Sequence, residues 1–81
     1  MPRVSAKIDF NGDLIELGKA VRRARKSRDI SQEDLATRCG LDRSNMGKIE
    51  RGERNLTTLT LLRIARELDL TLTELAADAC L

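Results

Sequence analysis

The fold of this chain is decided by one stretch of twenty residues, QEDLATRCGLDRSNMGKIER, at positions 32–51. Two short helices that cross at a sharp angle need apolar side chains where they face each other, a small residue at the closest approach and a turn residue that tolerates left-handed φ. The stretch supplies the apolar residues Leu35, Cys39, Leu41, Met46 and Ile49, the small residue Ala36 and the turn residue Gly40. This spacing predicts a helix-turn-helix, with an ordinary αα-hairpin that binds nothing as the alternative.

Three further helices are predicted outside this stretch, one from the apolar stripe Leu14, Leu17, Val21 and Ala24 and two from caps at Thr57 and Thr71, which makes the chain all-α. Polar residues that favour N-caps precede the apolar runs at Ser31, Asp42, Thr57 and Thr71, and an acid follows Ser31 and Thr71 at the capping-box spacing. The expected helices run over 13–28, from 32 to Gly40, from 43 to Gly52, over 58–68 and over 72–79. A core that contains almost no aromatic residue also suits helix packing better than strand packing.

Length and composition favour one small domain over residues 13–81, preceded by an irregular arm over residues 1–12. No apolar run is long enough to cross a membrane, and the first residues have no secretory h-region, so we expect a cytoplasmic location. The chain has no histidine, and Cys39 and Cys80 lack metal-ligand spacing. We therefore expect no metal and no cofactor, and read both cysteines as small apolar residues in a reducing compartment.

The net charge of +2 hides an uneven distribution along the chain. Residues 19–66 contain thirteen basic and six acidic residues, whereas residues 67–81 contain four acidic residues and no basic one. This asymmetry indicates either a surface on the central helices that faces a polyanion, or simply a well-solvated one.

The second helix of the predicted motif favours the polyanion. Its outward face carries basic and hydrogen-bonding residues without an acid: Arg43, Ser44, Gly47, Lys48 and Arg51. Such a helix fits the major groove of DNA, where base edges present a readable pattern of donors and acceptors. There Arg43 is expected on guanine, Ser44 and Asn45 on base edges or phosphate, and Lys48 on guanine or phosphate. Gly47 is expected to let the backbones approach.

The longer segment SQEDLATRCGLDRSNMGKIERGERNLT (31–57) resembles the DNA-binding domain of the Xre family, the Cro/CI-like repressors. Within that family, LDRS and IERGERN are most similar to the controller proteins of restriction–modification systems. The resemblance covers about residues 14–79 and implies the five-helix, lambda-repressor-like fold.

The resemblance also implies roles for single residues. Gln32 would contact a phosphate, and Arg43, Ser44 and Lys48 would face the bases. The residues Arg51, Arg54 and Asn55 would hold the DNA backbone after the recognition helix. The pair Arg25 and Glu50 would form a largely buried salt bridge, which is structural because removing one partner leaves a buried charge unpaired. The arm over residues 1–12 has no counterpart in the family.

Surplus apolar residues near the C-terminus suggest a homodimer. One small core does not need all of the leucines there, so the predicted interface takes Leu59 and Leu62 from the fourth helix, and Leu70, Leu72, Leu75 and Leu81 from the fifth helix and its flanks. Regulators of this class bind paired half-sites as dimers. The alternative is that these leucines complete the core of the monomer.

The sequence therefore predicts a transcriptional regulator that binds double-stranded DNA as a dimer on a pseudo-palindromic operator. A restriction–modification controller is favoured over an antitoxin or a phage-type repressor. RNA polymerase is a further candidate partner, through the acids Glu33, Asp34 and Glu53. A helical protein-interaction module is the competing class. An enzyme is not expected, because no histidine, paired carboxylates, phosphate loop or nucleophile triad is found.

Overall fold

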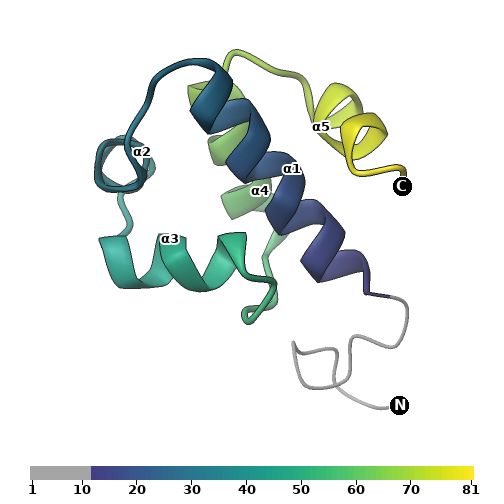
Figure 1. The fold of residues 1–81 in the computed structure, drawn as a ribbon, viewed down its shortest axis with the longest axis horizontal. Coiled ribbons are helices and arrows are strands. Elements are labelled where there is room, and N and C mark those ends of the chain that lie inside the picture. The colour runs from purple at the N-terminus through teal and green to yellow at the C-terminus, as the bar shows by residue number, and fades with distance from the viewer. Residues whose placement is uncertain (1–11) are drawn as a thin grey trace.

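The computed structural model describes residues 12–81, which form five α-helices joined by short links. In chain order they are α1 (Asp13–Ser27), α2 (Gln32–Arg38), α3 (Arg43–Glu50), α4 (Thr58–Glu67) and α5 (Leu72–Asp78) (Figure 1). The all-α fold is as predicted, and every helix begins at the expected residue. Helices α1, α4 and α5 end one residue early because Arg28, Leu68 and Ala79 are C-caps. Apart from Gly12, the expected N-terminal arm lies outside the described residues.

The four predicted N-caps all accept a hydrogen bond from the backbone N–H three residues later. Only Thr71 and Glu74 complete a capping box, in which the Glu74 carboxylate accepts from the Thr71 N–H at 3.0 Å. That bond keeps the pKa of Glu74 below its usual value. At the other expected box the Asp34 carboxylate instead accepts from Arg38 at 2.9 Å, since Asp is one methylene shorter than Glu. The predicted N-cap at Ser31 is therefore confirmed, but the capping box predicted there does not form.

Three links between helices share one geometry, in which a left-handed residue is followed by an apolar residue. The left-handed positions are Asp29 (φ 53°), Gly40 (φ 71°) and Asp69 (φ 58°). The N–H of the next residue bonds the carbonyl five residues back, in the pairs Ile30–Arg25, Leu41–Ala36 and Leu70–Ala65. This is the Schellman arrangement, which ends a helix and turns an apolar side chain back onto it. The three apolar residues all pack against the core.

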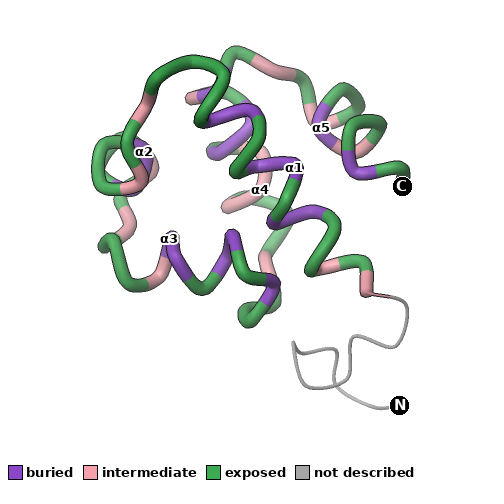
Figure 2. The backbone as a smooth tube through the Cα atoms, in the orientation of Figure 1, coloured by how far each residue is buried: buried purple, intermediate pink, exposed green. Residues whose placement is uncertain are grey.

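Every helix contributes to a single core. Its most deeply buried large side chains are Val21 of α1, Leu35 of α2, Met46 of α3, Ile64 of α4 and Leu75 of α5, with Leu68 just after α4. Buried positions alternate with exposed ones along α1 and α3, as expected when one face of each helix is covered (Figure 2). Figure 1 shows α2 and α3 together on one side of the molecule and α5 on the other, with α1 running between them.

The crossing of α1 and α3 depends on Gly18. A Cβ at this position would lie 2.4 Å from the carbonyl oxygen of Ile49 and 2.6 Å from that of Glu50. The two helices therefore approach backbone to backbone, and any larger residue would push α3 away from α1. The helix-turn-helix spacing predicts a small residue at a helix crossing only at Ala36, which is indeed buried, and gives no sign of this second crossing at Gly18.

Candidate DNA-binding surface

Helix α3 turns one side to the core and the other to solvent. Met46, Ile49 and Glu50 are buried, whereas Arg43, Ser44 and Lys48 are exposed. The Asp42 carboxylate fixes the start of the helix by accepting from the backbone N–H of Asn45 at 2.7 Å. A short helix held at its N-terminus and along its inner face presents its outer side chains in a fixed register. The three residues expected to face bases therefore lie on one accessible surface.

Gly47 does not lie on that accessible surface, contrary to the expectation for it. It is buried, and a Cβ there would lie 3.1 Å from a terminal guanidinium nitrogen of Arg51 and 3.5 Å from Oε1 of Gln32. The two long side chains cover it from the end of α3 and the start of α2. Its small size thus makes room for the Gln32 and Arg51 side chains, rather than for a DNA backbone.

A buried ion pair lies where α1, α2 and α3 meet. Arg25 of α1 donates from Nε and Nη2 to the two carboxylate oxygens of Glu50, at 2.7 and 3.0 Å. The side chains are 11% and 3% exposed, so this is the buried pair implied by the family resemblance. Arg25 also donates to the Ile30 carbonyl at 3.0 Å, which ties the pair to the link before α2. Its fork geometry makes the pair rigid as well as charged.

Gln32 joins this ion pair, a contact that the sequence analysis missed. Its Nε2 donates to Oε1 of Glu50 at 3.2 Å, so the first residue of α2 is held by the last residue of α3. An amide nitrogen has two donor hydrogens, and one remains for a ligand such as a phosphate oxygen. The backbone N–H groups at the start of α2 lie at the same point, where the helix dipole favours negative charge.

Asn45, an expected base or phosphate contact, has a partner in this chain at each end of its amide. Its Nδ2 donates to the Asp42 carboxylate at 3.2 Å, and its Oδ1 accepts from the Arg54 guanidinium. Asn45 is thus a bridge between the N-cap of α3 and the segment after α3. It holds Arg54, a residue expected at the DNA backbone, against the recognition helix.

Arg51 and Glu53 form a close exposed pair beside this surface. Arg51 donates from Nε to Glu53 at 2.6 Å and from Nη2 at 3.4 Å. The hydrogen bond from Arg51 lowers the pKa of Glu53, so the carboxylate stays charged at neutral pH. Arg51, which is expected to bind a DNA phosphate, therefore already has the Glu53 carboxylate as a partner in this chain. Asn55 is exposed in the same segment, between α3 and α4.

The acids proposed for a polymerase contact fall into two places. Glu33 and Asp34 are exposed in the first turn of α2, where Asp34 is paired with Arg38. Glu53 lies beyond α3, paired with Arg51. The three acids therefore belong to two segments of the chain, and two of them are paired with an arginine.

The six leucines expected at a dimer interface do not all lie on the surface. Leu75 is completely buried within one chain, so it was wrongly placed in the interface, whereas Leu70 is partly buried where it packs against the same core. Leu59 and Leu81 are 79% and 58% exposed, and Leu62 and Leu72 are partly exposed. The amphipathic pattern could not separate them, because both sets lie on the same short helices.

Across residues 12–81, no group of histidine, cysteine and acidic side chains could hold a metal ion. None of the helices described is long and apolar enough to cross a membrane. Cys39 is partly buried against the core, which raises the pKa of its thiol, as fits a packing role.

Comparison with known proteins agrees with this geometry. The Helix-turn-helix family model matches residues 21–75. The control protein C.MunI from a Mycoplasma species is 38% identical over 70 residues, covering 85% of this chain and 95% of that protein. Among solved structures, the restriction-modification controller protein C.AhdI from Aeromonas hydrophila superposes with a TM-score of 0.76 at 42% identity, covering 79% of this chain and 97% of C.AhdI.

A further solved structure contains DNA. The biofilm regulator SinR, crystallised in complex with DNA, superposes with a TM-score of 0.68 at 27% identity, over 73% of this chain and 95% of that one. The resemblance to the Xre-like regulators and to the restriction–modification controllers is therefore confirmed, together with the lambda-repressor-like fold. With a family model that spans most of its length and a relative that it covers almost end to end, this chain belongs to the helix-turn-helix family.

Proposed function

We propose that this chain is a transcriptional controller of the restriction–modification type, which binds double-stranded DNA at a pseudo-palindromic operator. One observation carries the proposal: the exposed side of α3, with Arg43, Ser44 and Lys48, adjoins a polar junction that holds Gln32 at the start of α2. A helix in the major groove reads bases, while a helix N-terminus beside it receives a phosphate.

Each side chain then has a role that follows from its environment. Arg43 and Lys48 have no ion-pair partner among the described residues and are free to reach guanine acceptors or phosphate. Ser44 adds a short donor and acceptor on the same side of α3. Gln32, Arg51 and Arg54 bind the DNA backbone and set the register of α3 in the groove, and Asn55 lies beside them in the segment after α3. Asn45 acts by positioning Arg54.

The chain acts as a two-fold dimer. A single α3 contacts only a few base pairs, whereas two copies related by a two-fold axis read two half-sites about one helical turn apart. The apolar residues Leu59, Leu62, Leu72 and Leu81, exposed at the α4–α5 end, would form the interface. RNA polymerase is a further partner of this proposal, through the exposed acid Glu33 at the start of α2.

Selection of bound sites from random duplex DNA tests the proposal. We expect a two-fold symmetric sequence to be enriched, and its affinity to fall steeply as salt rises, because phosphate contacts release counterions. Sedimentation of the free protein should show a dimer at micromolar concentration. Recovery of no preferred sequence, or an affinity that is indifferent to salt, would contradict the proposal.

A further inference from the structure

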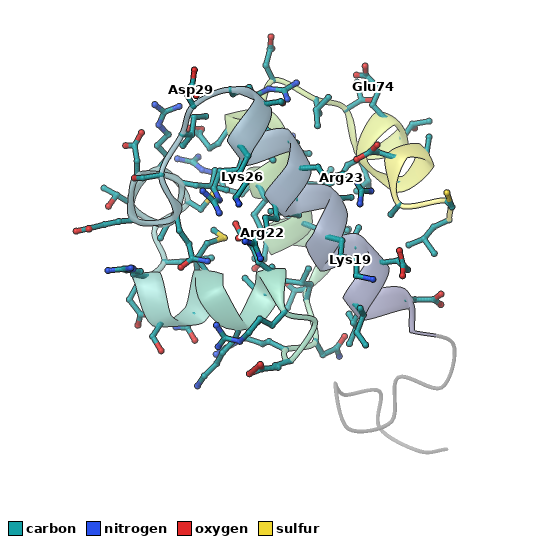
Figure 3. The ribbon with its side chains drawn as sticks, in the orientation of Figure 1. Lys19, Arg22, Arg23, Lys26, Asp29 and Glu74 are labelled. Atoms are coloured by element: carbon teal, nitrogen blue, oxygen red, sulfur yellow. The ribbon has the colours of Figure 1, made fainter. Side chains whose placement is uncertain are left out.

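The outer face of α1 carries a group of cations that the helix-turn-helix does not include. Lys19, Arg22, Arg23 and Lys26 are all exposed, and the pairs Lys19/Arg23 and Arg22/Lys26 are each four residues apart, so they form two neighbouring rows along the helix (Figure 3). Like charges on one side of a helix repel one another weakly, so an acidic partner or an external anion at this face would be favourable.

Two of these cations have acidic partners in the chain. Lys19 contacts the Glu16 carboxylate at 3.4 Å. Arg23 donates to the Asp78 backbone oxygen at 3.0 Å and contacts its carboxylate at 3.4 Å, which turns it toward α5. These two cations are thus engaged along α1 itself or at the boundary with α5.

The other two cations, Arg22 and Lys26, have no ion-pair or hydrogen-bond partner among residues 12–81. Arg22 lies one turn after Gly18 and one turn before Arg25, and both of those residues contact α3. Arg22 therefore borders α3, and Lys26 lies one turn further along, closer to α2. Figure 3 shows Arg22 over the region between α1 and α3, and Arg23 on the side of α5.

We propose that Arg22 and Lys26 form a second phosphate-binding ridge, which grips the DNA backbone next to the phosphate received by Gln32. The Arg25–Glu50–Gln32 junction connects the two sites, because Arg25 stands on the same side of α1 as Arg22 and its partner Glu50 also holds Gln32. The ligand is the phosphodiester backbone, since two separate exposed cations, a guanidinium and an ammonium, match successive phosphates and read no base.

This inference rests on the proposed DNA binding, and a charge-matched pair of variants tests it. Arg22→Gln with Lys26→Gln removes one arginine and one lysine from the proposed ridge. Arg23→Gln with Lys19→Gln removes the same charges from the paired side of the same helix. All four side chains are exposed, so thermal unfolding should confirm that both variants are folded. The measurement is affinity for the selected operator and for random DNA at several salt concentrations.

We expect the Arg22/Lys26 variant to bind operator at least about tenfold more weakly at low salt, with a salt slope that is shallower by about 0.9 for each phosphate that is no longer neutralised. The ratio of operator to random affinity should stay unchanged, because cations on the DNA backbone carry no sequence information. The Arg23/Lys19 variant should bind within about twofold of the native chain. Arg22→Lys with native Lys26 should retain most of the affinity.

Equal reductions in affinity in the two variants would overturn the ridge, because they would show a general charge effect. Full affinity in the Arg22/Lys26 variant would also overturn the proposal, because it would show that these two cations do not bind the DNA backbone. An acidic protein would then be the better candidate for a partner of this face of α1. Failure of the proposed function looks different, since the native chain itself would then select no sequence.

Discussion

The two ends of this small domain use their polar and apolar residues in opposite ways. Around α2 and α3, polar side chains form closed chains of contacts, from Arg25 through Glu50 to Gln32, and from Asp42 through Asn45 to Arg54. On α4 and just after α5 lie instead the two most exposed large apolar residues of the described chain, Leu59 and Leu81. The hydrogen bonds around α2 and α3 fix the positions of donors such as Gln32 and Arg54, as binding of a charged ligand requires. The exposed leucines at α4 and after α5 are apolar surface that a partner could bury.

Charge follows the same division. No basic residue occurs after Arg66. Within residues 12–81, two cations without an ion-pair partner lie on α1 (Arg22 and Lys26) and two on α3 (Arg43 and Lys48). Phosphate would repel the acidic C-terminal end, so this end is not expected at the DNA. The comparison predicts that substitutions near α3 change stability or DNA binding, and that surface substitutions near α4 and α5 change assembly.

The largest effect should come from Glu50→Ala, which leaves the buried guanidinium of Arg25 without its partner. We expect the free energy of unfolding to fall by about 3–5 kcal/mol. Urea denaturation followed by circular dichroism measures this loss. Replacing Arg25 and Glu50 together by apolar residues of similar volume should restore much of the stability. A loss below about 1 kcal/mol in the single variant would show that the junction contributes little to the fold.

Much of this architecture could be predicted from the sequence because local signals determine it. The caps at Ser31, Asp42, Thr57 and Thr71 and the left-handed residue Gly40 act on their own helix ends, so the starts of α2 to α5 were predictable from them. The outward positions of Arg43, Ser44 and Lys48 follow from helical periodicity. These features need no knowledge of distant parts of the chain.

The features that were missed depend on contacts between helices. Gly18 has an ordinary place in α1, and only the approach of α3 shows why a larger residue would not fit. Leu75 and Leu72 have similar positions in the sequence pattern, yet only Leu75 is covered by the rest of the chain. Which polar pairs form, such as Asn45 with Arg54, likewise depends on the tertiary arrangement.

The next largest effect is expected on DNA affinity, where Arg43 should contact a base and Arg54 the DNA backbone. Arg43→Ala should cost about 1–3 kcal/mol of operator affinity and relax the preference at one base pair of each half-site. Arg54→Ala should weaken binding to operator and to random DNA alike and flatten the salt slope. Titrations of both duplexes at several salt concentrations separate the two patterns. Identical behaviour of the two variants would mean that the division of roles along α3 is wrong.

Assembly is tested by two leucines that differ in burial. Leu59→Ala should leave the monomer folded but weaken the dimer by about 1–3 kcal/mol, because a side chain exposed in one chain loses its burial against the partner. Leu75→Ala should instead destabilise the monomer by about 2–5 kcal/mol, since it opens a cavity in the core. Sedimentation velocity and thermal unfolding distinguish these outcomes. A Leu59→Ala protein that sediments as the native chain does would exclude Leu59 from the interface.

The smallest effect concerns the acid beside the DNA-binding surface. In the free chain, Arg51 is paired with Glu53, and this pairing competes with any bond from Arg51 to phosphate. Glu53→Gln removes the competing charge and should strengthen DNA binding by about two- to fivefold at low salt, with the gain shrinking as salt screens the surface. Glu33→Gln is the matched control, because it removes an acid from the first turn of α2 that has no ion pair among the described residues. An equal gain from both variants would show that net charge alone sets the affinity, whereas a gain confined to Glu53→Gln would show that this carboxylate limits how much of Arg51 is available to the DNA.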